Sequence, residues 1–416
     1  MKDITAEEYV VADGSKAWNS GGSGSHPYIR RVMQIIIFLV GYAMLWMILY
    51  NDSNSPLGLP AISHHSVIDS SKNNHSKLEN VLSEASMENK TVIITVINDA
   101  WAKPGSIFDL FLESFHIGGN QTEKLLNHLV VVTWDQKAYV RCLSLHKHCY
   151  QIETNGGNFT SEAIYMTPTY LHMVWRKIEF LGSVLQMGYS FVFTDCDIMW
   201  LRDPFRHFYK DGDFQISCDE FNGNSSDIRN SPNSGFSYVK SNERTVWFYK
   251  FWFNSSEANL KTQDVLNKIK LDPLVSKKKL KFRFLSTHYF GGFCEPSRDF
   301  KKVTTMHANC CVGLQTKIND LRLLLDDWRK YMTLSEDEKN ISHPSWSVPQ
   351  NCRTSFQRYG IRSKLTKLVT AKGYFTRSAV GKKPTPTQFK EKKERKVKTT
   401  NIDTVSRAKD TLQVAQ

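Results

Sequence analysis

Several residue types are scarce in this 416-residue chain, and their scarcity excludes whole classes of protein. Its 22 glycines and 13 prolines are too few for a collagen-like repeat, and its eight cysteines are too few for a small disulfide-based scaffold. Because 41% of the residues are apolar and 12% are aromatic, the chain is not disordered throughout. Its length and apolar content suffice for one large domain or two ordinary ones with a sizeable buried core.

Net charge is nearly absent from most of the chain. The formal charge of +13 is concentrated at the C-terminal end, where residues 361–416 hold 15 Lys and Arg against 4 Asp and Glu. That end therefore carries +11, which leaves +2 for residues 1–360. Within it, residues 382–398 are Lys-rich, contain proline and have few large apolar residues, a composition typical of disorder. A polyanionic partner would have to meet this tail.

One long apolar run lies near the N-terminus. Residues 1–31 are mostly polar and end in two arginines, and the run over residues 32–50 follows them directly, with Gln34 as its only strongly polar member. A helix of this length spans about 28 Å, close to one hydrocarbon core. A cleaved signal peptide would have a shorter apolar stretch nearer the start. We therefore expect a transmembrane signal anchor over 32–50, preceded by a cytosolic segment over 1–31.

All cysteines and N-glycosylation acceptors follow the apolar run. Asn51 lies too near the bilayer for easy modification, and the other acceptors are Asn74, Asn89, Asn120, Asn158, Asn224, Asn254 and Asn340. The cysteines are Cys142, Cys149, Cys196, Cys218, Cys294, Cys310, Cys311 and Cys352. No repeated Cys-x-x-Cys motif indicates a zinc site. This distribution predicts a lumenal domain in which some cysteines are paired, and the spacing leaves the pairing open.

The lumenal part is expected to contain a stem, a domain and the tail. Residues 51–88 are rich in serine and asparagine and show little periodicity, which is typical of a stem. Residues 89–355 contain the apolar runs that a packed catalytic domain requires, and residues 356–416 form the basic tail. For a tail on the lumenal side, an acidic polysaccharide such as pectin is the hypothetical partner, and we expect no nucleic acid.

Buried strands alternate with helical segments in the expected domain. Apolar runs at Thr91–Asn98, Leu129–Thr133 and Phe191–Thr194 predict strands that are buried on both faces. Residues at helical spacing lie between them, over Ile107–Phe115 and Met166–Met187. The alternation predicts an α/β fold with a mostly parallel sheet covered by helices on both faces. In such sheets, ligands bind at the carboxyl ends of the strands.

Two aspartates directly follow the third predicted strand. Asp195 and Asp197 are one residue apart, so both carboxylates can reach one Mg²⁺ or Mn²⁺ ion, which prefers oxygen ligands. Such an ion neutralises a diphosphate as it leaves. Two alternatives remain open, because the aspartates could cap a turn or belong to an aspartyl-phosphate phosphatase. Those phosphatases usually have Thr or Val where this chain has Met199.

The segment around the two aspartates resembles a known family. LGSVLQMGYSFVFTDCDIMWLRDPF is similar to the plant nucleotide-diphospho-sugar transferases of glycosyltransferase family 77. Further similar segments are VIITVINDAWAKPGSIFDLFLESF, HLVVVTWDQKAYVRC, SPNSGFSYVKSNERTV, QDVLNKIK, FGGFCEPSR and MHANCCVGLQTKINDL. The resemblance covers about residues 90–328. It implies a Rossmann-like GT-A fold, a nucleotide-sugar donor, transfer with retention, and a type II Golgi membrane protein with a lumenal catalytic domain.

The resemblance also implies a metal and diphosphate site. Asp195 and Asp197 would be the carboxylate ligands of Mn²⁺ or Mg²⁺. His307 stands where a late histidine completes the metal shell in such enzymes, and its alternative is a hydrogen-bonded core histidine. Lys177 stands where the family has a lysine that would hold a phosphate or orient Asp195. Lys317 would pair with the departing diphosphate. Each lysine has a solvated surface cation as its alternative.

Two further segments would contact the transferred sugar. Gln263 and Asp264 stand where retaining enzymes often have Asp-Gln-Asp, with the glutamine near the anomeric carbon. Thr262 replaces the first aspartate, and Asp264 is alternatively a helix N-cap. A polar turn is expected at Asn233, Ser234 and Gly235, where glycine allows close approach of the backbone to a sugar.

The nucleoside would lie at the ends of the first two strands. Thr95, Asn98 and Asp135 stand there, and we expect them near the uridine base and ribose. This expectation is positional, and a structural role accounts equally well for each residue.

Three function classes follow from these features. The first is a glycosyltransferase that moves arabinofuranose, xylose or galactose from a UDP-sugar to a cell-wall glycan or hydroxyproline-rich glycoprotein. No residue qualifies as a nucleophile, so the departing diphosphate would assist the acceptor and we assign no catalytic base. The second is an inactive relative that binds donor without turnover, which Thr262 suggests. The third is a nucleic-acid-binding protein, and residence in the Golgi lumen would exclude it.

Overall fold

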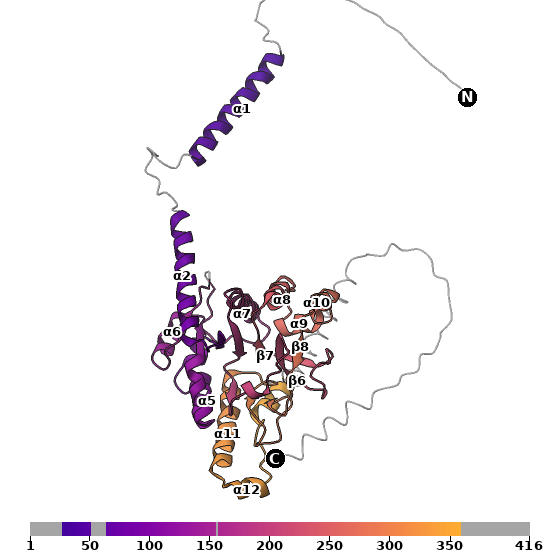
Figure 1. The fold of residues 1–416 in the computed structure, drawn as a ribbon. Helices are drawn as coiled ribbons and strands as arrows, with labels where there is room; N and C mark the ends of the chain where they lie inside the picture. Colours follow the sequence, from indigo (N-terminus) through magenta and orange to yellow (C-terminus); the bar gives the residue numbers. More distant parts are fainter. Residues whose placement is uncertain (1–26, 51–63, 155–156, 359–416) are drawn as a thin grey trace, which may run out of the picture. The chain divides into compact units, whose positions relative to one another are not determined.

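A computed structural model describes residues 27–50, 64–154 and 157–358 of the chain (Figure 1). The side chains of residues 27–30, 44–50 and 64–73 lie outside this description. The cytosolic segment expected before the helix, the first part of the expected stem and nearly all of the basic tail also lie outside the described residues. The chain falls into two compact units, Met1–Lys72 and Asn73–Gln416.

The first unit contains helix α1, Pro27–Tyr50. Its described part exposes a run of large apolar side chains, which are Met33, Ile35, Ile36, Ile37, Phe38, Leu39, Val40 and Tyr42. Within the described part of the chain, no helix is both long enough and apolar enough to cross a membrane. The membrane span expected over 32–50 extends into residues 44–50, whose side chains are not described.

Seven strands form the central sheet of the second unit, in the spatial order β3-β2-β1-β4-β7-β6-β8. The strands are β1 (Thr91–Ile97), β2 (Leu129–Thr133), β3 (Cys149–Gln151), β4 (Ser190–Thr194), β6 (Phe214–Glu220), β7 (Ser231–Val239) and β8 (Phe282–Phe284). Only β7 runs antiparallel to its neighbours β4 and β6, and the other four pairings are parallel. The sheet is therefore mostly parallel, as the alternation of strands and helices predicts.

Helices cover both faces of this sheet. Ile93 and Ile97 of β1 belong to one core cluster, and Val92 and Ile94 belong to the other, because successive side chains of a strand point to opposite faces. The helices on the first face are α4 (Ile107–Ile117), α6 (Gln136–Leu143) and α11 (Leu314–Thr333). Those on the second face are α7 (Pro168–Gln186), α8 (Glu243–Asn254) and α9 (Thr262–Ile269), which lie together in Figure 1.

The packed body begins before the boundary expected at residue 89. Helix α2, His64–Ala85, occupies sequence that we interpreted as a featureless stem. Its side chains Leu78, Leu82 and Ala85 are buried in the same core cluster as β1. Their spacing of three and four residues places them on one helical face, a signal that the many serines and asparagines obscure.

A second sheet of three strands contains His307, the last of the three predicted metal ligands. Its order is β5 (Ile198–Trp200), β10 (Thr305–His307) and β9 (Phe290–Gly292). β10 is antiparallel to β5, with Ile198 opposite His307, and parallel to β9. This pairing places His307 beside the residue that follows Asp197. The remaining short helices are α3 (Asp99–Ala102), α5 (Asn120–Lys124), α10 (Pro273–Lys277), α12 (Glu336–Ile341) and the 3₁₀ turns η1 (Leu125–His128) and η2 (Phe205–His207).

Three disulfides form among the eight cysteines, Cys142–Cys149, Cys294–Cys310 and Cys311–Cys352. Cys196 and Cys218 are free and buried, and burial raises the pKa of both thiols. The predicted pairing of some cysteines is thus confirmed. Of the expected glycosylation acceptors within the described residues, Asn74 is half-buried and the others are exposed.

Candidate metal and sugar-diphosphate site

Two carboxylates and an imidazole meet at the carboxyl end of β4. The possible ligand atoms of Asp195, Asp197 and His307 all lie within 4.8 Å of one another. His307 Nε2 is 3.3 Å from Asp197 Oδ1. The two aspartates follow β4 directly, and the pairing of β5 with β10 brings the histidine to them from the far end of the chain. We call these three residues the metal group.

The metal group has an acceptor that the protein satisfies poorly. The side chain of Asp197 is 3% exposed, and its Oδ1 accepts no well-aligned hydrogen bond from any described residue, although His307 Nε2 lies 3.3 Å away. A buried carboxylate oxygen without a well-aligned donor is unfavourable. Two carboxylates and one neutral imidazole are ligands that Mn²⁺ and Mg²⁺ accept. The residues present therefore fit a divalent cation.

Each aspartate of the metal group also contacts a lysine. Lys177, buried on α7, lies 3.1 Å from Asp195 Oδ1 and sits over the Phe193 ring. Lys317, on the first turns of α11, donates to Asp197 Oδ2 and to a backbone carbonyl. Neither lysine is a solvated surface cation, so the structure contradicts that alternative for both.

Asp197 is held in its ionised form. Burial alone raises its pKa, but the ammonium of Lys317 and the imidazole of His307 outweigh burial and hold the pKa of Asp197 below its ordinary value. A buried aspartate with these neighbours remains a carboxylate at neutral pH, which is the form that a metal requires.

Strand β7 supplies the polar segment that we expected to be a turn. Asn233, Ser234 and Gly235 lie within β7, so the predicted turn is wrong. The segment is the irregular part of β7, because the pairing with β4 begins at Phe236 and the register with β6 shifts between Pro232 and Ser237. The carbonyl of Gly235 accepts a hydrogen bond from the Asp195 amide at 2.7 Å. A Cβ on Gly235 would lie 2.6 Å from His307 Cε1 and 2.8 Å from Asp195 Oδ2. Glycine is therefore needed here for space beside the metal group.

An aspartate that we did not predict organises the neighbouring polar side chains. Asp219, near the end of β6, accepts hydrogen bonds from Asn233 Nδ2 at 2.7 Å, Gln263 Nε2 at 2.7 Å and Asn309 Nδ2 at 2.9 Å. We call these four residues the Asp219 cluster. Gln215 and Ser217 interrupt the apolar residues that precede Asp219, so the unbroken apolar run that identified Asp195 is missing here.

Helix α9 presents its first turn to this cluster. Gln263 donates to Asp219, and its Oε1 accepts from the Ser234 amide at 3.4 Å. The N-cap residue of α9 is Lys261, so the interpretation of Asp264 as a cap is wrong. Thr262 is buried, and Asp219 supplies a carboxylate to Gln263 although the aspartate expected at Thr262 is missing.

Tyr170 on α7 is a further residue that sequence reasoning missed. Burial, the adjacent Tyr165 and the carboxylates of Asp195, Asp197 and Asp264 raise the pKa of Tyr170. Tyr170 therefore remains a protonated phenol at neutral pH. It precedes Lys177 by two helical turns, so both face the same side of α7, and this spacing could have identified it.

The residues expected at the nucleoside are held by the protein itself. Asn98 caps α3 and donates to the carbonyls of Phe159 and Ser161. Asp135 caps α6 and also accepts from the amide of Asp99 at 2.8 Å. Thr95 is fully buried within β1. The caps of Asn98 and Asp135 are the structural roles that the sequence left open.

Comparisons with known proteins agree with this geometry. The family model described as nucleotide-diphospho-sugar transferase matches residues 124–321, which include the metal group and the Asp219 cluster. The chain is 49% identical over 279 residues to "Uncharacterized protein At4g15970" of Arabidopsis thaliana, covering 66% of this chain and 73% of that protein. It is 38% identical over 279 residues to "Uncharacterized protein At1g28695" of the same plant, covering 65% and 82%.

A third relative has a named activity. "UDP-galactose:fucoside alpha-3-galactosyltransferase" of Dictyostelium discoideum is 28% identical over 166 residues, which are 32% of this chain and 24% of that protein. The two Arabidopsis relatives extend the similarity over most of their own length, and the family match includes every residue of the metal group. This chain belongs to the nucleotide-diphospho-sugar transferase family.

Proposed function

We propose that this protein is a metal-dependent, retaining glycosyltransferase of GT-A type. It moves a sugar from a UDP-sugar donor to a cell-wall glycan or a hydroxyproline-rich glycoprotein. The single observation that carries the proposal is the convergence of Asp195, Asp197 and His307, whose possible ligand atoms all lie within 4.8 Å of one another. Two carboxylates and an imidazole that meet at one point are suited to a cation that binds a diphosphate.

The metal group would hold Mn²⁺ or Mg²⁺, and the bound ion would neutralise the charge of the departing uridine diphosphate. Lys177 orients Asp195 by their 3.1 Å contact. Lys317 reaches Asp197 and supplies a positive charge at the same place, so its ammonium can also attract the diphosphate. These residues bind and orient the donor.

The Asp219 cluster is proposed to bind the transferred sugar. Its carboxylate and amides offer both acceptors and donors, which is what the hydroxyls of a sugar require. The cluster lies next to the metal group, because Asn233 of the cluster bonds the amide of Gly235, and Gly235 bonds Asp195. No side chain is assigned as nucleophile or base, so the leaving diphosphate assists the acceptor.

Arabinofuranose, xylose and galactose are the proposed candidates for the transferred sugar. The resemblance to glycosyltransferase family 77 supports the two pentoses, and the named activity of the Dictyostelium relative supports galactose. These sugars differ only in ring size, configuration or one hydroxymethyl group, which changes few pocket contacts, so an assay must distinguish them.

The proposed location is the Golgi membrane, with a single span over 32–50 and the catalytic domain in the lumen. Three disulfides and several exposed glycosylation acceptors are typical of a lumenal domain. The exposed apolar side chains of α1 are of the kind that lipid would cover.

Release of uridine diphosphate from a panel of UDP-sugars by the full-length protein in detergent tests the function. We expect one donor to be hydrolysed with Mn²⁺ and not with a chelator. The double variant Asp195→Asn/Asp197→Asn should lose this activity, while the exposed-site control Asp337→Asn should keep it. Equal release by the double variant would contradict the metal-dependent mechanism.

The second candidate is a relative that binds donor without turnover. Thr262 favours it, because an aspartate is frequent at that place and the buried Thr262 has no carboxylate to offer. This candidate predicts Mn²⁺-dependent binding of a UDP-sugar by calorimetry and no release, with or without added acceptors.

A further inference from the structure

A cavity lies at the other end of the three-stranded sheet from the metal group. It has a volume of about 500 Å³, within the usual range for small-molecule sites. Thr304 lines it and precedes β10, whereas His307 ends that strand. Three residues of strand separate the two positions by about 10 Å. The cavity is therefore a different site on the same strand.

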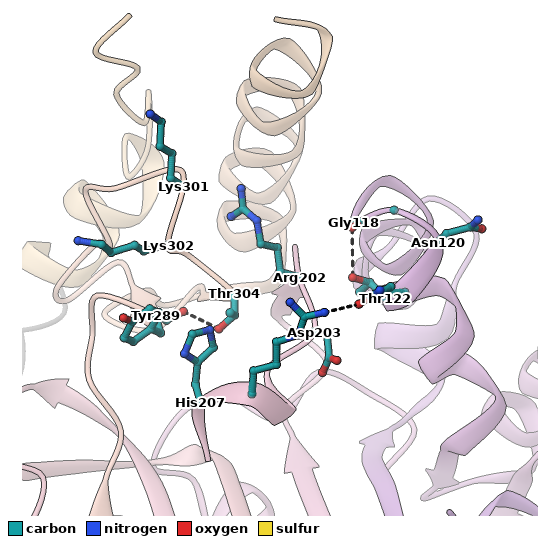
Figure 2. A pocket seen from close by; sticks show the side chains of 13 residues that line it. Gly118, Asn120, Thr122, Arg202, Asp203, His207, Tyr289, Lys301, Lys302 and Thr304 are labelled. Atoms are coloured by element: carbon teal, nitrogen blue, oxygen red, sulfur yellow. Dashed lines mark hydrogen bonds between the residues drawn. The ribbon is translucent and has the colours of Figure 1, made fainter. Parts of the chain in front are cut away.

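Two segments that are distant in sequence face each other across this cavity. Figure 2 shows Gly118 and Thr122 on one side, Lys301 and Lys302 on the other, and Arg202 between them. All of these residues are described.

Cations dominate the lining of the cavity. It contains four cations, which are Arg202, Arg206, Lys301 and Lys302, against one acid, Asp203. Asp203 Oδ1 already accepts from the amide of Phe205 at 2.8 Å. The lining therefore has a net positive charge.

A carboxylate outside the lining, Asp299, compensates part of this positive charge. It pairs with Lys302 at 3.3 Å and attracts Arg202 and Lys301 from farther away. Arg206 donates to the neutral amide of Gln121 at 2.8 Å, and Lys301 donates to the neutral amide of Asn340 at 2.6 Å. Arg202 donates to a backbone carbonyl and lies over the ring of Trp328. The neutral contacts fix the cations in place without cancelling their charge.

A flat aromatic surface borders the cations. The ring of His207 stacks on the ring of Tyr289, with their centroids 4.0 Å apart. Both residues line the cavity, and Figure 2 shows them side by side. The outer face of such a stacked pair is flat and apolar with polar edges, and the apolar face of a sugar ring is complementary to it.

We propose that this cavity binds an acidic oligosaccharide, meaning consecutive sugar rings that carry carboxylates. Guanidinium groups match carboxylates in geometry, and a repeating charge along the ligand meets several of the spaced cations together. The stacked rings receive a sugar face, which a simple inorganic anion lacks. This inference rests on the proposed function, because it takes the ligand to be part of the acceptor polymer held outside the catalytic site.

Binding of a short oligogalacturonate to the full-length protein tests the inference, with N-glycans trimmed because Asn120 lines the cavity. The fully methyl-esterified oligomer is the matched neutral probe. The triple variant Arg206→Ala/Lys301→Ala/Lys302→Ala should bind the acidic oligomer about tenfold more weakly than wild type. The control Lys137→Ala/Lys147→Ala/Lys250→Ala, which removes three exposed lysines elsewhere, should bind as wild type does.

A local readout separates the cavity from the basic tail, which is present in every variant. Bound oligogalacturonate should protect Lys301 and Lys302 from acetylation, as read by mass spectrometry, and should leave Lys137 and Lys147 reactive. Equal protection of all four lysines, equal binding by both triple variants, or equal binding of the esterified oligomer would overturn the inference. The assay needs no donor or metal, so its result does not depend on whether donor turnover is observed.

Discussion

The side-chain amide of Gln263 donates a 2.7 Å hydrogen bond to Asp219, a residue 44 positions earlier in the chain. The other oxygen of the same carboxylate accepts from Asn233 and Asn309. Because Ser234 donates to Gln263 Oε1, the orientation of this glutamine is fixed at both ends of its amide. Asp219 thus ties together α9, β7 and the segment after β10 at the carboxyl edge of the sheet.

Replacement of Asp219 by asparagine should reduce turnover. An asparagine side chain has only one oxygen that can accept hydrogen bonds, whereas a carboxylate has two. At least one of the three donors therefore loses its partner, and Gln263 is no longer held. We expect donor hydrolysis to fall about 100-fold, the effect of a misplaced contact group, with little change in thermal midpoint. Steady-state release of uridine diphosphate and a thermal scan measure the two effects.

Glu220→Gln is the matched control for this variant. Glu220 is the next residue of the same strand and is exposed. Its substitution by glutamine therefore converts a carboxylate into an amide outside the Asp219 cluster. Wild-type turnover by Asp219→Asn would show that the Asp219 cluster does not support the reaction.

The fold could be predicted from the sequence more completely than the Asp219 cluster. The run Leu129–Thr133 coincides with β2, because unbroken apolar residues bounded by polar ones leave few alternatives. The roles of Asp195 and Asp197 could be predicted from the sequence for the same reason, because both residues follow such a run. The partners of Asp219 come from three different elements, and no periodicity relates residues whose contact depends on the packing of α9 and β7.

The predicted turn at Asn233–Gly235 shows a second limit. Polar and small residues favour turns in isolation. Here Asn233 donates to Asp219, Ser234 donates to Gln263 and Gly235 accepts from the amide of Asp195, so tertiary hydrogen bonds override the local preference. Family resemblance placed His307 near the metal, and only the antiparallel register of β5 and β10 explains how it arrives there.

Gly235→Ala should weaken metal binding. The new Cβ would lie 2.6 Å from His307 Cε1 and 2.8 Å from Asp195 Oδ2, so two ligands must move apart. We expect the Kd for Mn²⁺, followed by electron paramagnetic resonance, to rise at least about tenfold, because ligand geometry limits affinity. Gly182→Ala on α7 is the control, since its Cβ meets only Tyr249 at 3.4 Å. Equal Mn²⁺ affinity of both variants with wild type would argue against a metal at this place.

Lys317→Ala should move the pH dependence of Mn²⁺ binding. The ammonium lowers the pKa of Asp197, so its removal raises that pKa and Asp197 takes up a proton at a higher pH. The acidic limb of the binding profile should therefore shift to higher pH. Lys330→Ala removes an exposed lysine from the same helix and should leave the profile in place. An unshifted limb for Lys317→Ala would mean that the lysine does not act on Asp197.

Non-reducing peptide mapping should find three disulfides and two free thiols. The pairs should be Cys142–Cys149, Cys294–Cys310 and Cys311–Cys352. Cys196 and Cys218 should resist alkylation in the folded protein and react after unfolding, because both are buried and burial raises their pKa. Rapid labelling of either thiol in the native state would contradict the packing around β4 and β6.

Asp213→Asn should destabilise the domain in a pH-dependent way. Asp213 is buried and accepts hydrogen bonds from Arg244, Asn242 and the amide of Lys281, which join β6 to α8 and β8. Burial alone raises the pKa of Asp213, but these donors, Arg244 first, outweigh burial and lower it. We expect a loss of about 2 kcal/mol in the free energy of unfolding at neutral pH.

The sign of the pH effect follows from proton binding. A carboxyl with a lowered pKa in the folded state binds fewer protons folded than unfolded, so its stabilisation is complete above the unfolded pKa of about 3.9. It is lost as the pH falls through the folded pKa. Wild type and Asp213→Asn should therefore differ most in thermal midpoint at neutral pH and converge in acid. Asp211→Asn removes a nearby exposed aspartate that pairs with Arg283 and should shift the thermal midpoint far less. Equal shifts for the two variants would mean that the buried hydrogen bonds of Asp213 do not stabilise the domain more than a surface ion pair.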